Sequence, residues 1–148
     1  MNEAILSVGS NINPVENLRR AAAILAEEQT WMDSSKIIIT KPVGYQYQPD
    51  FHNAAFYLKT RQDYLSFNES LKRVEIRLGR VKTVIKSGPR TIDLDIIIWN
   101  GYIVRDEFYY HDYVSGPTYE LVHKHGITLQ CAAPTDHPAR TKQLQLEN

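Results

Sequence analysis

The stretch that decides the fold reads GPRTIDLDIII and runs from Gly88 to Ile98. A rigid Gly-Pro turn leads into an apolar, β-branched run, which is typical of a strand. Successive side chains of a strand point to opposite faces, so Asp93 and Asp95 stand side by side while the apolar residues around them face a core. The run 96–98 is apolar throughout, which predicts a strand covered on both faces.

Two carboxylates this close repel each other, and a cation in front of them relieves the repulsion. Mg²⁺ prefers oxygen ligands and commonly takes one or two carboxylates together with substrate phosphates. We therefore interpret Asp93 and Asp95 as metal ligands. The alternative, two strand-end acids beside a solvated basic loop, stays open at this point.

The segment before this strand is strongly basic. Seven lysines and arginines, but only one acid, Glu75, lie between Lys72 and Arg90, in a chain whose formal net charge is zero. Phosphoryl transfer needs this arrangement, because metal ions bridge the phosphates while Lys or Arg offsets the developing charge. The zero net charge argues against a general nucleic-acid binder.

Length and composition predict one domain. The 148 residues are 43% hydrophobic, which is enough for a core. No apolar run approaches the ~20 residues that span a membrane, and residues 1–3 do not begin a signal peptide. Cys131 is the only cysteine, which fits a cytoplasmic location and a small buried or half-buried residue. We expect residues 1–148 to form a single domain whose last ~10 residues are a polar tail.

Periodicity predicts four strands and two helices. The strands are expected at residues 4–8, 36–40, 53–60 and 93–99. The first helix should begin with a capping box formed by Asn13 and Glu16, and the second should end at Gly79. Asn100-Gly101 predicts a hairpin to a short strand at 102–104.

Beyond this hairpin the pattern weakens. Gly116-Pro117 is interpreted as a turn, and residues 118–124 as helical. The order is βαββαβ, followed by a hairpin strand and an irregular C-terminal segment. We therefore predict an α+β, ferredoxin-like sandwich.

Four blocks in this order resemble a known family. They are SVGSN with the following Asn-Leu, PVG leading to QPDFHNAA, Glu with LGR, and GPRTIDLDI, which fall at 7–18, 42–55, 75–80 and 88–96. Together they resemble the 6-hydroxymethyl-7,8-dihydropterin pyrophosphokinases, folate-pathway enzymes that transfer pyrophosphate from ATP to a pterin alcohol and release AMP. The resemblance covers residues 4–100.

The resemblance implies roles for the acids and arginines. Asp93 and Asp95 would hold two Mg²⁺ ions that bridge ATP, the co-substrate, and the pterin. Arg80 and Arg90 would engage the phosphates, with Arg80 on a closing loop. These four residues are the predicted catalytic set.

The resemblance also implies a pterin pocket. Asn53 would bond the ring edge, where an amide offers both donors and acceptors. Phe51 would stack on the ring, and Thr40 and the Val43 backbone would line the pocket. Taken singly, Phe51 is better explained by a core position and Asn53 by a local turn, and only the four ordered blocks together favour the pocket. Ile127 falls where the family has its second stacking aromatic, and Tyr113 or Tyr119 is an alternative.

The predicted nucleotide contacts are Lys72, Glu75, Lys82 and His111. Lys72 stands where the family commonly has Gln, and the Lys72–Glu75 spacing also suits a plain surface ion pair. His111 has the approximate spacing of the family's ATP-contacting histidine but different neighbours.

The sequence therefore predicts a Mg-dependent, cytoplasmic pterin pyrophosphokinase in folate biosynthesis. We expect small-molecule substrates, no nucleic acid, no membrane and a monomer. Two alternatives stay open: a divergent paralogue with another acceptor, and a non-catalytic nucleotide-binding module.

Overall fold

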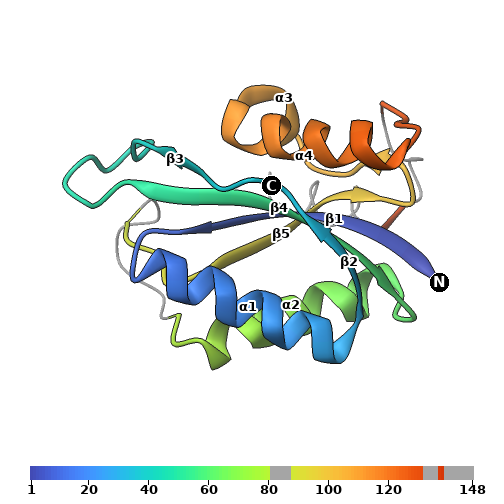
Figure 1. Ribbon diagram of the computed structural model, residues 1–148, viewed down its shortest axis with the longest axis horizontal. Helices are drawn as coiled ribbons and strands as arrows, with labels where there is room; N and C mark the ends of the chain where they lie inside the picture. The colour runs from blue at the N-terminus through green and yellow to red at the C-terminus, as the bar shows by residue number, and fades with distance from the viewer. Residues whose placement is uncertain (81–87, 132–136, 139–148) are drawn as a thin grey trace.

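An antiparallel sheet forms the centre of the computed structural model, which describes residues 1–80, 88–131 and 137–138 (Figure 1). In the described part the strand order is β2-β4-β1-β5-β6, and β3 pairs with β4 outside this path. The strands are β1 (Asn2–Ser10), β2 (Thr30–Ser34), β3 (Ile38–Thr40), β4 (Phe51–Thr60), β5 (Asp93–Trp99) and β6 (Tyr102–Ile103).

Helices cover both faces of the sheet (Figure 1). The helices are α1 (Pro14–Glu28), α2 (Tyr64–Arg77), α3 (Glu107–Tyr110) and α4 (Asp112–His125). The larger core lies between the sheet and the α1–α2 layer, and a second core lies under α3 and α4. The predicted α+β, ferredoxin-like class with a hairpin strand is confirmed, with β2 as one strand more than predicted, and so is the two-sided burial of β5.

Helix α4 is tied to β2 through Asp33. Its carboxylate lies 2.8 Å from Lys124 Nζ and 2.8 Å from His125 Nε2. Hydrogen bonds from Lys124 and then His125 lower the pKa of Asp33 to about 2. Lys124 and His125 at the end of α4 therefore fix the helix over the sheet.

Two predictions in the first half of the chain need correction. The strand expected at 36–40 is only the short β3, and β2 precedes it; β2 was missed because a register shift between Trp31 and Asp33 breaks its alternation. The capping box at Asn13 is wrong, because Asn13 is left-handed (φ 41°) and its side chain makes no cap bond.

Two predictions in the second half are also wrong. Pro117 is not in a turn but inside α4, where Val114, Pro117 and Leu121 form a buried stripe at helical spacing. Burial of this stripe outweighs the hydrogen bond that Pro117 cannot donate. Cys131 is exposed rather than buried, because it follows the last described pairing of the chain with the sheet at Gln130.

None of the helices in the described residues has the length and apolar character needed to cross a membrane. The predicted polar tail lies almost entirely outside the described residues.

Candidate active site

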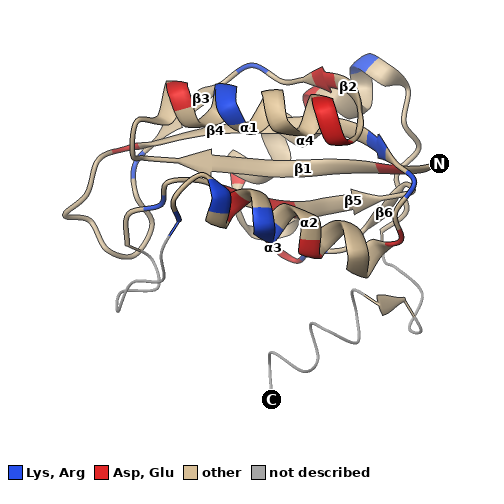
Figure 2. Ribbon diagram, turned by 90° about the horizontal axis from the view of Figure 1, so that it is seen from below, with Lys and Arg blue, Asp and Glu red and all other residues tan. Residues whose placement is uncertain are grey.

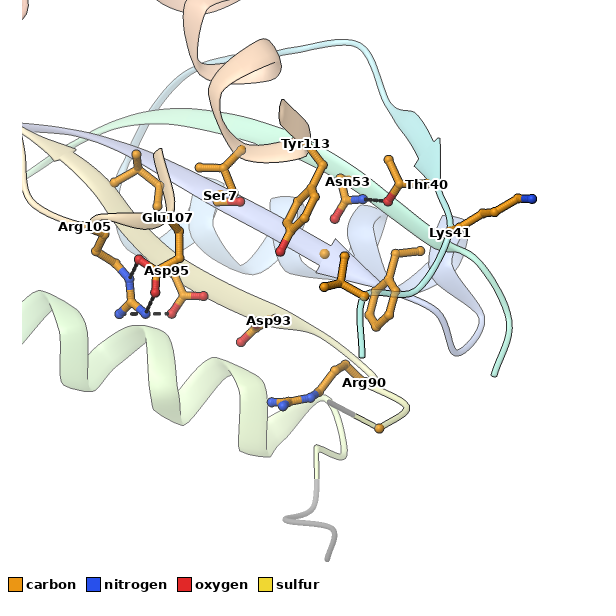
Figure 3. A pocket seen from close by; sticks show the side chains of 16 residues that line it. Ser7, Thr40, Lys41, Asn53, Arg90, Asp93, Asp95, Arg105, Glu107 and Tyr113 are labelled. Carbon is orange, nitrogen blue, oxygen red and sulfur yellow. Dashed lines mark hydrogen bonds and ion pairs between the residues drawn. The ribbon is translucent and has the colours of Figure 1, made fainter. Parts of the chain in front are cut away.

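A cleft lies between the sheet and α4, above the acidic end of β5 (Figure 3). Strands β1, β3, β4 and β5 supply its floor and one side, and α3 and α4 supply the other. Its lining comprises Ser7, Gly9, Thr40, Lys41, Val43, Phe51, Asn53, Gly88, Arg90, Asp93, Asp95, Ile97, Arg105, Glu107, Tyr113 and Val114.

The alternation of β5 places both acids in this cleft. Asp93 pairs across the sheet with Gly9, and Asp95 with Ser7, while Leu94 between them is fully buried in the opposite core. The side-by-side arrangement that the sequence predicts is thus present. It is fixed by the sheet register rather than by a loop.

Side chains of α2 complete the outer edge of β5. Strand β6 reaches only Ile98 and Trp99, so it cannot pair with the backbone of Leu94. Instead the Leu94 N–H donates to Glu75 Oε2 at 2.7 Å, and Lys72 Nζ donates to the Leu94 carbonyl at 2.9 Å. Two side chains one helical turn apart therefore replace a neighbouring strand.

Acidic and basic residues lie close together around α2 and β5 (Figure 2). Arg80 Nη1 lies 2.7 Å from Asp93 Oδ1 and also 2.7 Å from Glu75 Oε1. Glu75 is only 3% exposed, and a buried charge needs compensation. Lys72, at 3.1 Å, supplies its second cation.

Asp95 shares Lys72 with Glu75 and has Arg105 as a second cation. Lys72 Nζ lies 3.3 Å from Asp95 Oδ1, and Arg105 Nη1 lies 3.7 Å from the same oxygen. Arg105 in turn makes hydrogen bonds of 3.1 and 3.2 Å to Glu107. Sequence reasoning missed Arg105 and Glu107, since nothing in their local pattern marks them as part of the cleft.

The surroundings shift the pKa values of Asp93 and Asp95 in opposite directions. Burial, followed by the charge of Asp95, raises the pKa of Asp93 to about 6. Burial also acts to raise the pKa of Asp95, but Lys72 and Arg105 outweigh it, so this pKa is lowered. Asp95 is therefore the better stabilised anion of the pair.

The other end of the cleft suits a flat, polar ring. Asn53 is 4% exposed and donates through Nδ2 to Thr40 Oγ1 at 2.6 Å. A Cβ atom on Gly9 would lie 2.9 Å from Asn53 Oδ1, so only glycine lets the amide sit here undisturbed. Phe51 lines this end, and Tyr113 projects into the cleft from α4 (Figure 3).

Asn11 holds the loops at the edge of the cleft. Its backbone N–H donates to the Arg90 carbonyl at 3.1 Å, and its Oδ1 accepts from the Arg90 N–H at 2.8 Å. Its Nδ2 donates to the Pro49 carbonyl at 2.9 Å. Asn11 thereby links the start of α1 to two segments far away in the sequence.

Comparisons with known proteins agree with this geometry. The sequence model for "7,8-dihydro-6-hydroxymethylpterin-pyrophosphokinase (HPPK)" matches residues 5–123. The chain belongs to this pyrophosphokinase family.

Similar proteins carry the corresponding name. A "2-amino-4-hydroxy-6-hydroxymethyldihydropteridine pyrophosphokinase" of Haemophilus influenzae is 35% identical over 70% of this chain and 66% of its own length. The protein of that name from Bacillus subtilis is 40% identical over 67% of this chain and 60% of its own. "Folic acid synthesis protein fol1" of Schizosaccharomyces pombe is 35% identical over 70% of this chain but only 14% of its own length. The chain thus spans less than two thirds of the length of these relatives.

The structure brings most of the predicted pyrophosphokinase residues together. The following line the cleft: Thr40, Val43, Phe51, Asn53, Arg90, Asp93 and Asp95. Lys72 and Arg80 contact its acids from α2 and the residues after it, and Glu75 pairs with both of these cations. Lys82 lies outside the described residues.

Two predicted residues do not line the cleft themselves. Ile127 packs against the core under α4 and lines a separate small cavity with Tyr57. His111 precedes α4 and stacks on Tyr113 with ring centroids 4.9 Å apart. Tyr113, which the sequence left as an alternative, is the aromatic of α4 that reaches the cleft.

The donor set fits a hard divalent cation that shares its ligands with a substrate. In the described residues no group of three or more His, Cys, Asp and Glu side chains could hold a metal alone. Asp93 and Asp95 supply only carboxylate oxygens, which is the donor set of a Mg²⁺ ion completed by phosphates and water.

Proposed function

We propose that this chain transfers the pyrophosphoryl group of ATP to the hydroxymethyl oxygen of 6-hydroxymethyl-7,8-dihydropterin. The observation that carries the proposal is one cleft that joins the Asp93–Asp95 pair to a ring-binding end formed by Asn53 and Phe51. Family membership adds the reaction named for the relatives.

In this proposal the acceptor oxygen forms a bond to the β-phosphorus of ATP. The bond between that phosphorus and the α–β bridging oxygen breaks, and AMP leaves with the bridging oxygen. The proton of the acceptor hydroxyl passes to solvent. Asp93 and Asp95 would hold two Mg²⁺ ions, which when bound neutralise the phosphates and make the acceptor hydroxyl more acidic.

As the nucleotide binds, the basic side chains would exchange their carboxylate partners for the phosphates. Arg80 lies against Asp93 in the structure, and Arg90 lines the cleft beside it. Guanidinium groups make bidentate bonds to phosphates, so these two residues are placed to hold and neutralise the transferring group. Lys72, Glu75, Lys82 and His111 remain our proposed nucleotide-side residues.

The ring would lie between Phe51 and Tyr113, with its polar edge at Asn53. Burial, then the charges of Asp93 and Glu107, raise the pKa of Tyr113, so its hydroxyl stays protonated in the cleft. Stacking on a second ring is worth about 1 kcal/mol beyond simple burial. We propose Tyr113 rather than Ile127 for that role, with Thr40 and Val43 at the rim. We further propose that the protein acts as a monomer in the cytoplasm.

The test is AMP release from MgATP by the purified protein, with and without the pterin alcohol. We expect pterin-dependent AMP in the wild type and none in Asp95→Ala, which should remain folded because its side chain lies outside both cores. MgATP binding without pterin-dependent AMP would instead favour another acceptor or a non-catalytic binding module. Full turnover by Asp95→Ala would remove the metal assignment.

A further inference from the structure

Lys72 is held in one place by three acceptors. Its ammonium group lies 2.9 Å from the Leu94 carbonyl, 3.1 Å from Glu75 Oε2 and 3.3 Å from Asp95 Oδ1. An ammonium group has three donors, and here each of them has an acceptor. Although 40% of its side chain is exposed, Lys72 therefore carries a charge that is held beside Asp95.

The negative charge of Asp95 is consequently already offset before any metal ion binds. Arg105 Nη1 is a second positive group, 3.7 Å from the same carboxylate oxygen. A divalent ion at Asp95 would lie within a few ångströms of both groups, where like charges repel strongly even at a partly screened site. Charge on the neighbouring Asp93 is likewise offset by Arg80, at 2.7 Å.

A nucleotide changes this balance. Its phosphates bring several negative charges and many acceptor oxygens, which can take the hydrogen bonds of Lys72 and Arg105. The repulsion that opposes a metal ion at Asp95 then falls, and the phosphates add ligands to the ion. Metal and nucleotide should therefore strengthen each other's binding by the same factor.

We propose that Lys72, assisted by Arg105, is a built-in counter-ion of Asp95 that keeps divalent metal off the acid pair until a nucleotide arrives. The inference rests on the proposed function, because it takes Asp93 and Asp95 as the metal ligands. It makes Lys72 a positioning residue that sets the order of binding: metal enters with the nucleotide and not before it.

The experiment measures Mn²⁺ binding to the full chain from the free-ion EPR signal, without nucleotide and with α,β-methylene-ATP. We expect Lys72→Gln to tighten Mn²⁺ binding without nucleotide by about tenfold, and to shrink the effect of the nucleotide by a similar factor. Lys72→Arg, which keeps the charge, should resemble the wild type.

The matched control is Arg73→Gln. Arg73 follows Lys72 on α2 and is exposed, with its guanidinium 3.4 Å from Ser70 Oγ rather than near the acids. The Arg73→Gln substitution removes the same charge from the same helix, so it should change Mn²⁺ binding by less than about twofold. Arg105→Gln is a second variant that leaves the Leu94 edge intact, and it should tighten Mn²⁺ binding by about threefold.

Unchanged or weaker Mn²⁺ binding in both Lys72→Gln and Arg105→Gln would overturn the counter-ion role. So would equal tightening in Arg73→Gln, since net charge would then explain the effect. Asp95→Asn separates this failure from failure of the proposed function. If Asp95→Asn binds Mn²⁺ in the presence of α,β-methylene-ATP as well as the wild type does, the metal site itself is wrong.

Discussion

Replacing Asp93 by asparagine should stabilise the metal-free protein, whereas the same change at Asp95 should destabilise it. The reason is the unequal surroundings of the two acids. Burial and the charge of Asp95 raise the pKa of Asp93 to about 6, so its ionised form is unfavourable in the folded state at neutral pH. Lys72 and Arg105 lower the pKa of Asp95, so its ionised form is favourable.

The size of the effect at Asp93 follows from the pKa difference. A rise from 3.8 to about 6 corresponds to about 3 kcal/mol at neutral pH. Since 36% of the side chain is exposed, solvent screening reduces this to about 1 kcal/mol. Arg80 keeps its 2.7 Å contact with Glu75 when Asp93 is neutralised, so no charge is left alone.

Thermal unfolding in EDTA at neutral pH measures both changes. For a chain of this size we expect the Tm of Asp93→Asn to rise by about 2–4 °C. The Tm of Asp95→Asn should fall by a similar amount, because Lys72 and Arg105 each lose a carboxylate partner. Glu27→Gln, which removes the same charge at an exposed position of α1, should leave the Tm within about 1 °C of the wild type.

The pH dependence has a definite sign. Asp93 binds its proton more tightly in the folded state. The loss of folding stability caused by ionised Asp93 is therefore fully present above about pH 6 and disappears as the pH falls toward 3.8. The gain in free energy of unfolding from Asp93→Asn should therefore fall by about half between neutral pH and pH 5. A Tm for Asp93→Asn that is as low as that of Asp95→Asn at neutral pH would refute the asymmetry between the acids.

Three further changes test other parts of the structure. Gly9→Ala should force the Asn53 amide aside, because the new Cβ would lie 2.9 Å from its oxygen; titration should show pterin binding weakened about tenfold with MgATP binding retained. Asp33→Asn should lower the free energy of unfolding, measured with urea at neutral pH, by about 1 kcal/mol, because solvent screens this ion pair. Because the folded pKa of Asp33 is about 2, this difference should vanish as the pH falls from about 4 to 2, and a difference that persists there would exclude the ion pairs as its source. Tyr113→Ala should weaken pterin binding about fivefold while Ile127→Ala leaves it unchanged, and the reverse pattern would restore Ile127 as the stacking position.

Much of the site could be predicted because its residues carry local signals. The alternation of Asp93 and Asp95 follows from strand geometry. Asn53 and Phe51 lie on one strand with the same alternation, so they reach the same cleft.

The partners of these residues could not be predicted in the same way. Asn11 and Arg90 are joined by hydrogen bonds across 79 positions of sequence, and no local pattern records that contact. Interpreting Pro117 as a turn hid the first half of α4, including the face that carries Tyr113. Spacing alone put Ile127 at the position of the family's second stacking aromatic, because the pattern did not show that α4 begins at Asp112 and brings Tyr113 to the cleft.

The way α2 completes the edge of β5 has a consequence for self-association. An unpaired strand edge can recruit a strand from another molecule. Here the backbone N–H and carbonyl of Leu94 are paired with Glu75 and Lys72, so a second chain finds no free backbone group at that point. The same two side chains that arrange charge around the acids therefore also close this part of the sheet edge to a strand from another molecule.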